Sequence, residues 1–175
     1  MLYILYIVVA LLALLLLIAV IIKKNYTIIS EVVIEKEKDV VFNYIIYLKN
    51  QERYNKWIVE DPKVKIVYTG TDGAVGFTSA WESGKRDVVG EQELTAIMPG
   101  EGYTSELRFE KPFKGVSHTK VTARAITPSQ TKVTTVFNTR TEFPMSAMIP
   151  LLKKMLLKDM NVTAQNLKRV IEAKH

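Results

Sequence analysis

The C-terminal stretch, residues 146–174, constrains the fold more than any other part of the chain. Side chains of one stripe recur there at steps of three, four and seven residues, the spacing of one face of an α-helix. The stripe comprises Met148, Leu152, Met155, Leu156, Thr163, Leu167, Val170 and Ile171. Pro150 interrupts the pattern and either starts the main run or kinks it. Such a helix is about 40 Å long and is too apolar on one side to stand alone in water. It therefore needs a partner surface within the chain.

The segment between residues 27 and 143 supplies that surface, because most of it has the pattern of β-strands. A first strand of β-branched residues is expected at 27–35, followed by two short helices, one from Asp39 to Leu48 and one at 50–57. Six more strands are expected at 64–69, 77–83, 88–97, 103–109, 115–126 and 132–143. Consecutive strands joined by short turns favour an antiparallel meander. The sequence therefore predicts an α+β fold, with a curved antiparallel sheet of about seven strands around the long C-terminal helix.

One face of these strands combines small or polar side chains with aromatic ones, and this suggests a cavity. A wall with space for a ligand and a few hydroxyls to orient it has this composition. We predict an apolar wall of Trp81, Tyr103, Phe109, Phe137, Met148, Leu152 and Met155. We predict polar points at Ser79, Ser105, Ser117, Thr119 and Thr135. The alternatives are a solvent-facing sheet with ordinary strand threonines and a core whose irregular gaps the methionines fill.

Residues 1–22 contain no charged side chain, proline or glycine, and Lys23 and Lys24 follow directly. About 20 apolar residues are needed for a helix to cross a bilayer. The start is not basic and lacks a small-residue cleavage pattern, which favours a retained anchor over a cleaved signal peptide. We therefore expect a transmembrane anchor at 1–22, a short linker at 23–26 and a ligand-binding domain at 27–175. The lysines after the span predict a single-pass protein of the cell membrane with its C-terminal domain in the cytoplasm.

The residues that usually carry catalysis are sparse. The chain has no cysteine, which excludes thiol catalysis and cysteine-ligated metal. His118 alternates with Lys120 on the strand face opposite the small residues, which is typical of a solvated surface histidine. The sequence predicts no catalytic residue, metal ligand or cofactor. The net charge of +6 is scattered along the chain, which favours a solvated surface over a nucleic-acid site.

The order of elements and several short motifs resemble a known superfamily. The motifs are Ile34-Glu35, Val41-Phe42-Asn43-Tyr44-Ile45, Tyr54-Asn55-Lys56-Trp57, Gly73-x-x-Gly76-Phe77-x-x-x-Trp81-Glu82, Val89-Gly90-Glu91, Phe109-Glu110-Lys111-Pro112-Phe113-Lys114-Gly115 and Phe143-Pro144-Met145. The chain resembles the START-like superfamily, also called SRPBCC, and its bacterial polyketide cyclase/dehydrase-like branch, with an added N-terminal transmembrane helix. The resemblance implies the helix-grip fold and a cavity between sheet and C-terminal helix that holds an apolar small molecule.

Three functions are compatible with this sequence. The first is a membrane-anchored binding module for a lipid or other hydrophobic small molecule, held between the sheet and the C-terminal helix. The second is a polyketide cyclase/dehydrase-like enzyme that acts on an aromatic or polyketide-like substrate, although no residue requires catalysis. The third is a protein-interaction domain, as in co-chaperone and toxin relatives of the fold. The expected partners are the membrane and the hydrophobic molecule, with no nucleic acid.

Overall fold

The computed structural model describes residues 2–21, 23–85, 87–143 and 145–173. Its helices are α1 (Leu2–Ile21), α2 (Lys38–Ile45), α3 (Lys56–Val59) and α4 (Ile149–Glu172), with short 3₁₀ helices η1 (Leu48–Arg53) and η2 (Met145–Met148). Its strands are β1 (Asn25–Ile34), β2 (Lys65–Thr69), β3 (Thr78–Glu82), β4 (Val89–Met98), β5 (Gly102–Lys111), β6 (Gly115–Thr127) and β7 (Gln130–Arg140).

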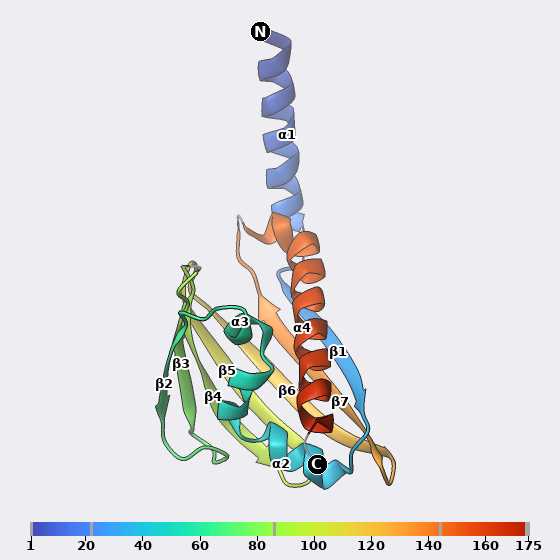
Figure 1. The fold of residues 1–175 in the computed structure, drawn as a ribbon. Coiled ribbons are helices and arrows are strands. Elements are labelled where there is room, and N and C mark those ends of the chain that lie inside the picture. Colours follow the sequence, from blue (N-terminus) through green and yellow to red (C-terminus); the bar gives the residue numbers. More distant parts are fainter. Residues whose placement is uncertain (1, 22, 86, 144, 174–175) are drawn as a thin grey trace.

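The strands form one antiparallel sheet in the order β1-β7-β6-β5-β4-β3-β2. Strands β2 to β7 follow the chain as a meander, and β1 joins the outer edge of β7. Figure 1 shows the sheet curving around α4, with α2 and α3 on the same side of the sheet as α4. The predicted α+β architecture is thereby confirmed, and it is that of a helix-grip fold.

Alternation along the strands decides which face of the sheet meets α4. In β1, Ile28, Ser30, Val32 and Ile34 are buried, whereas their neighbours are mostly exposed. Successive side chains of a strand point to opposite faces, so a period of two in burial marks one covered face. The same alternation appears in β6, where Ser117, Thr119, Val121 and Ala123 are the buried residues. The covered face therefore carries hydroxyls as well as aliphatic side chains, as predicted.

Helix α4 begins at Ile149, three residues later than expected, because residues 145–148 form the separate 3₁₀ helix η2. Pro150 lies in the first turn of α4, where its missing N–H would have no helical partner in any case. Proline thus starts this helix and does not kink it. The buried side chains of α4 are Ile149, Asp159, Met160, Leu167 and Ile171.

Two other boundaries differ from the sequence prediction. Strand β1 begins at Asn25, so residues expected in a linker pair with β7, Asn25 opposite Arg140 and Tyr26 opposite Thr139. The second short helix is divided into η1 and α3, with Tyr54 and Asn55 between them. The Asn55 side chain accepts a hydrogen bond from the backbone N–H of Trp57 (3.1 Å), and this cap starts α3 afresh.

The hydrophobic core lies where α2, η1 and the last turns of α4 meet the sheet. Its members include Ile34, Ile45, Phe77, Leu94 and Ile171, all almost fully buried. The core therefore occupies the end of the sheet near the C-terminus of α4. The candidate site lies between the middle of α4 and the sheet.

The predicted transmembrane anchor at residues 1–22 is not supported, and the predicted single-pass localisation in the cell membrane is wrong. A bilayer crossing requires one helix of about 20 predominantly apolar residues. Within ranges 2–21, 23–85, 87–143 and 145–173, no helix has both the length and the apolar character for that role. Residues 1 and 22, the two ends of the predicted span, lie outside the described residues. The cytoplasmic orientation predicted from Lys23 and Lys24 depends on this anchor and is not supported either, because an uncharged sequence run does not by itself establish a span.

Candidate functional site

A cavity of about 120 Å³ lies between the sheet and α4. Its lining combines the covered face of the sheet, one face of α4 and the segment from η1 to α3. The lining residues are Val32, Ile45, Gln51, Tyr54, Asn55, Trp57, Gln92, Tyr103, Leu107, Thr119, Val121, Val133, Thr135, Phe137, Leu156, Met160, Thr163, Ala164 and Leu167. Most are apolar, and the polar ones carry only hydroxyl or amide groups.

The sheet supplies the floor of the cavity through rows of paired residues. Thr119 of β6 lies opposite Phe137 of β7, and Val121 lies opposite Thr135. Tyr103 of β5 extends the second row, because it pairs with Val121 on the other side of β6. Antiparallel pairing thus brings residues from distant parts of the chain onto one patch of the covered face.

A chain of hydrogen bonds between amides forms one wall. Asn55 donates to the side-chain oxygen of Gln51 (3.1 Å), and Gln51 Nε2 donates to Gln92 Oε1 (3.1 Å). Gln92 Nε2 in turn donates to Ser105 Oγ, a fully buried contact of 2.8 Å. Each of these groups therefore has at least one hydrogen-bond partner, and this offsets part of the cost of burying them beside an apolar cavity.

The electrostatic character of the cavity is neutral. Among the described lining residues there is no Asp, Glu, Lys, Arg or His. Burial raises the pKa of the Tyr54 phenol well above its usual range. Burial also raises the pKa of Tyr103, although a hydrogen bond from Gln51 opposes part of that rise. Both phenols therefore remain protonated at neutral pH and can act as uncharged hydrogen-bonding groups.

Contacts from Lys56 hold the η1–α3 side of the cavity against α4. The Lys56 ammonium lies 2.8 Å from Asp159, and both side chains are nearly buried, with 15% and 12% exposed. The backbone N–H of Lys56 also donates to Thr163 Oγ1 (3.1 Å). The hydrogen bond to Asp159 is the main cause of the raised Lys56 pKa. Tyr54, which lies next to these residues, accepts a hydrogen bond from Asn166 Nδ2 at its backbone oxygen (3.2 Å).

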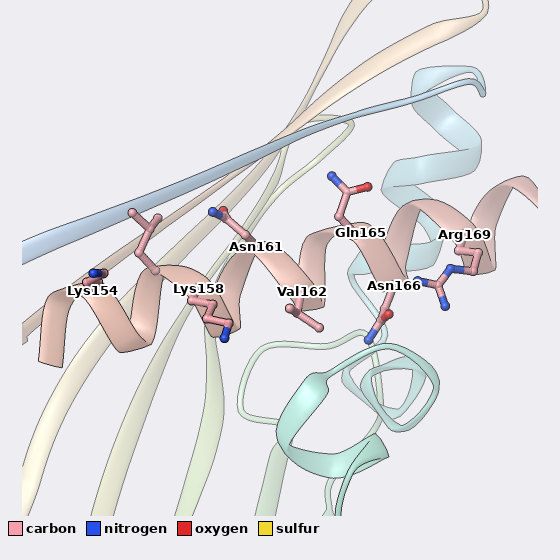
Figure 2. A pocket seen from close by; sticks show the side chains of 8 residues that line it. Lys154, Lys158, Asn161, Val162, Gln165, Asn166 and Arg169 are labelled. Atoms are coloured by element: carbon pink, nitrogen blue, oxygen red, sulfur yellow. The ribbon is translucent and has the colours of Figure 1, made fainter. Parts of the chain in front are cut away.

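The outer side of α4 bears a larger hollow, of about 510 Å³, but it is open to solvent. Figure 2 shows side chains of one helix around this hollow. The residues that line it are Lys154, Leu157, Lys158, Asn161, Val162, Gln165, Asn166 and Arg169. Asn161 accepts a hydrogen bond from Ser30 of β1 (2.7 Å), so part of this surface is structural. A hollow bounded by a single helix lacks facing walls, and we therefore place the candidate site in the less open cavity on the other side of α4.

Four of the twelve predicted site residues line the cavity, namely Tyr103, Thr119, Thr135 and Phe137. Each comes from β5, β6 or β7, the three strands that cross the middle of the sheet. Strand alternation sufficed to find these residues, because all four point toward the covered face.

The remaining predicted sheet residues lie on the same face but outside the cavity. Ser105 accepts the hydrogen bond from Gln92, and Ser117 donates to Thr139 (2.7 Å). Trp81 and Phe109 pack edge-on, with ring centroids 5.9 Å apart. Ser79 is buried in β3, one strand from the sheet edge. The sequence placed these residues on the correct face without indicating how far along the sheet the cavity extends.

The predicted helix residues do not line the cavity. Met148 and Met155 are 43% and 49% exposed, and Leu152 is half-buried. Met148 belongs to η2, whose turn of about three residues shifts it out of phase with α4. The α4 residues that do line the cavity are Leu156, Met160, Thr163, Ala164 and Leu167, which begin one turn beyond Leu152. The predicted Met-rich wall is therefore replaced by a wall with a single methionine.

The amides are the lining residues that sequence reasoning missed. Gln92 alternates with Leu94 on the covered face of β4, and that register was the available signal for its burial. Gln51 and Asn55 lie in a polar segment whose composition gave no sign that it covers a cavity. Elsewhere in the described part of the chain, no three His, Asp or Glu side chains are grouped so as to hold a metal ion.

Charges gather on the opposite, outer face of the sheet. Arg108 forms ion pairs with Glu91 (2.6 Å), Glu93 (2.6 Å) and Glu106 (2.7 Å). His118 is 66% exposed at its side chain, 3.8 Å from Glu106, in agreement with the surface position inferred for it. This cluster is separated from the cavity by the sheet and does not contribute to it.

Comparison with known proteins supports the fold. No protein-family model matches the chain, and no curated protein matches it. Among solved structures, norcoclaurine synthase from Thalictrum flavum, in complex with dopamine and hydroxybenzaldehyde, is similar with a TM-score of 0.65 and 12% identity, covering 86% of this chain and 89% of that chain. A protein from Chromobacterium violaceum is similar with a TM-score of 0.62 and 13% identity, covering 85% and 98%.

A third similar structure is the protein XoxI from Bacillus cereus, with a TM-score of 0.60 and 10% identity, covering 86% of this chain and 97% of that chain. The structural neighbours thus share the START-like, or SRPBCC-type, fold that the sequence motifs suggested. At these identities the likeness establishes the fold alone.

Proposed function

We propose that this protein binds an uncharged hydrophobic small molecule in the cavity between the sheet and α4, and that the range 27–175 is its binding unit. The observation that carries the proposal is the cavity itself, which is lined by side chains from the sheet, the η1–α3 segment and α4. Cavities with mostly apolar walls and a few oriented polar groups are the usual form of small-molecule sites. Thr119, Thr135, Tyr103 and Phe137 are the sequence-predicted residues that would contact the ligand.

Cavity size narrows the class of ligand. Sites for drug-sized molecules commonly measure about 300–1,000 Å³, whereas this one measures about 120 Å³. An engineered apolar cavity of about 150 Å³ in another protein binds benzene. A compact molecule of about one ring therefore fits this cavity better than an extended lipid chain. The complex of norcoclaurine synthase with dopamine and hydroxybenzaldehyde is consistent with one-ring ligands in this fold.

Filling the cavity tests the proposal. Thr135 is half-buried and borders the cavity, whereas its neighbour Thr134 bonds Glu31 on the other face (2.9 Å). We expect Thr135→Trp to abolish binding of indole, measured by calorimetry on the full chain, because the new ring occupies the cavity. Thr134→Trp is the matched control and retains binding. Chemical unfolding of both variants shows whether the fold is retained.

Two results would contradict the proposal. If Thr135→Trp unfolds the protein while Thr134→Trp does not, the region behaves as close-packed core without usable space. If indole binds equally to the wild type and to Thr135→Trp, the ligand site lies elsewhere. Native mass spectrometry of gently purified protein would add the mass of any ligand that copurifies.

A further inference from the structure

The polar wall of the cavity has hydrogen-bonding capacity that its internal contacts leave unused. A side-chain amide offers two N–H donors and an oxygen that accepts twice. Within the described residues, Gln92 uses one donor toward Ser105 and one acceptor position toward Gln51. Gln92 is only 8% exposed, so its remaining capacity is turned away from bulk water. A bound molecule is the available partner for it.

Tyr103 adds a second group of this kind at the same place. Its side chain is 2% exposed and lines the cavity. A tyrosine hydroxyl has one proton that it can donate and an oxygen that can accept. Gln51, Gln92 and Tyr103 therefore converge as neutral donors and acceptors on one end of the cavity.

The rest of the lining is more apolar, and its other polar side chains are Tyr54, Asn55, Thr119, Thr135 and Thr163. Leu107, Phe137, Leu156, Met160 and Leu167 contribute only apolar surface. An ion placed there would lose its hydration without gaining an opposite charge, because no described lining residue is ionised at neutral pH. A wholly apolar molecule would leave the amides and the phenol without the partner they can bind.

From this geometry we infer that the ligand is a neutral, one-ring-sized molecule with a single hydroxyl or carbonyl group, which Gln51, Gln92 and Tyr103 bind. This inference rests on the proposed function, since it names the ligand class of the same cavity. The polar group of the ligand lies toward η1, β4 and β5, and its ring lies toward Phe137 and α4.

Three probes of matched shape test the inference on the full chain at pH 7. They are p-cresol, with a hydroxyl, p-xylene, with a methyl group in its place, and p-toluate, with a carboxylate. We expect p-cresol to bind about tenfold more tightly than p-xylene, because one well-placed neutral hydrogen bond changes the affinity by about that factor. We expect p-toluate to bind at least about a hundredfold more weakly than p-cresol, because its charge would be buried without a partner.

Tyr103→Phe removes only the hydroxyl. We expect it to lower the affinity for p-cresol about tenfold and to leave the affinity for p-xylene within about twofold. The ratio of the two affinities is measured in one protein, so a general loss of stability does not change it. Gln51→Leu removes an amide of the same wall at a half-buried position. It replaces Tyr103→Phe in the same comparison of affinities if Tyr103→Phe does not fold. The control is Tyr26→Phe, because the Tyr26 hydroxyl contacts Thr141 (3.2 Å) and lies outside the cavity lining.

The outcomes separate this inference from the proposed function. If p-xylene binds as tightly as p-cresol, or if p-toluate binds most tightly, the inferred ligand class is wrong while the cavity remains a binding site. An unchanged p-cresol to p-xylene ratio in both Tyr103→Phe and Gln51→Leu also overturns it. If none of the probes binds and indole does not bind either, the proposed function itself is refuted.

Discussion

Two truncations on α4, one turn apart, should differ in cost because only one of them borders the cavity. Leu167 is 5% exposed and lines the cavity, whereas Ile171 is 1% exposed and packs in the core outside the lining. Leu167→Ala and Ile171→Ala each remove three carbon atoms. The transfer contribution is therefore the same for both, about 2.4 kcal/mol at ~0.8 kcal/mol per carbon.

The two variants differ in the volume they leave empty. Truncation of a fully packed residue adds about 24 cal/mol for each Å³ of new cavity, which brings the total toward 4 kcal/mol. Leu167 already faces empty space on one side, so fewer packing contacts are lost and the total stays near 2–3 kcal/mol. Helix propensity favours alanine by a few tenths of a kcal/mol in both cases and does not reverse the order. We expect Ile171→Ala to cost at least about 1 kcal/mol more.

The assay is urea unfolding followed by circular dichroism, with the free energy of unfolding taken from curves of equal slope. Leu151→Ala is the control on the same helix, because Leu151 is 61% exposed and should change stability by less than about 0.5 kcal/mol. A cost for Leu167→Ala equal to or above that for Ile171→Ala would refute the reasoning, since it would mean that Leu167 is packed on all sides.

Two further predictions concern stability. Asp61 accepts hydrogen bonds from Ser83 Oγ (2.6 Å) and from the backbone N–H groups of Gly84 (2.9 Å), Lys63 and Lys85, and the Ser83 bond is the main cause of its lowered pKa. Because the folded pKa lies below the ordinary aspartate value of about 3.9, this contribution is complete above that pH and is lost as the pH falls through the folded pKa. Asp61→Asn should therefore destabilise the protein at pH 7 and progressively less below about pH 4, and a constant difference in acid unfolding curves would contradict this. Gly102 has φ +154°, and an added Cβ would lie 1.9 Å from the Val121 carbonyl oxygen. Gly102→Ala should therefore lower the free energy of unfolding by more than about 3 kcal/mol. Gly115 has no atom within 4 Å of an added Cβ, so Gly115→Ala should lower it by less than about 1 kcal/mol. Equal melting temperatures for these two glycine variants would show that the β5–β6 approach at Gly102 is not tight.

Local patterns in the sequence determined the elements and the face of the sheet that is covered. The period of two in β5, β6 and β7 placed Tyr103, Thr119, Thr135 and Phe137 on that face, because alternation is a property of every strand. The same reasoning gave the long C-terminal helix and the meander. The membrane span that the uncharged run predicts at residues 1–22 is not supported, because no helix of the described residues has the length and apolar character to cross a membrane.

Tertiary structure alone decided where along the sheet the cavity lies and what its polar wall contains. The face of α4 that borders the cavity carries Leu156 and Met160, whereas Met148 lies in η2 and Met155 is 49% exposed, so neither of these two belongs to the wall. Gln51 and Gln92 are 41 residues apart and meet only because η1 folds over β4. A contact between distant segments depends on how the sheet curves and on which loops cover it, and no local periodicity encodes either. The chemistry of the candidate site is therefore a product of packing, whereas the strands and helix that frame it follow from the sequence pattern.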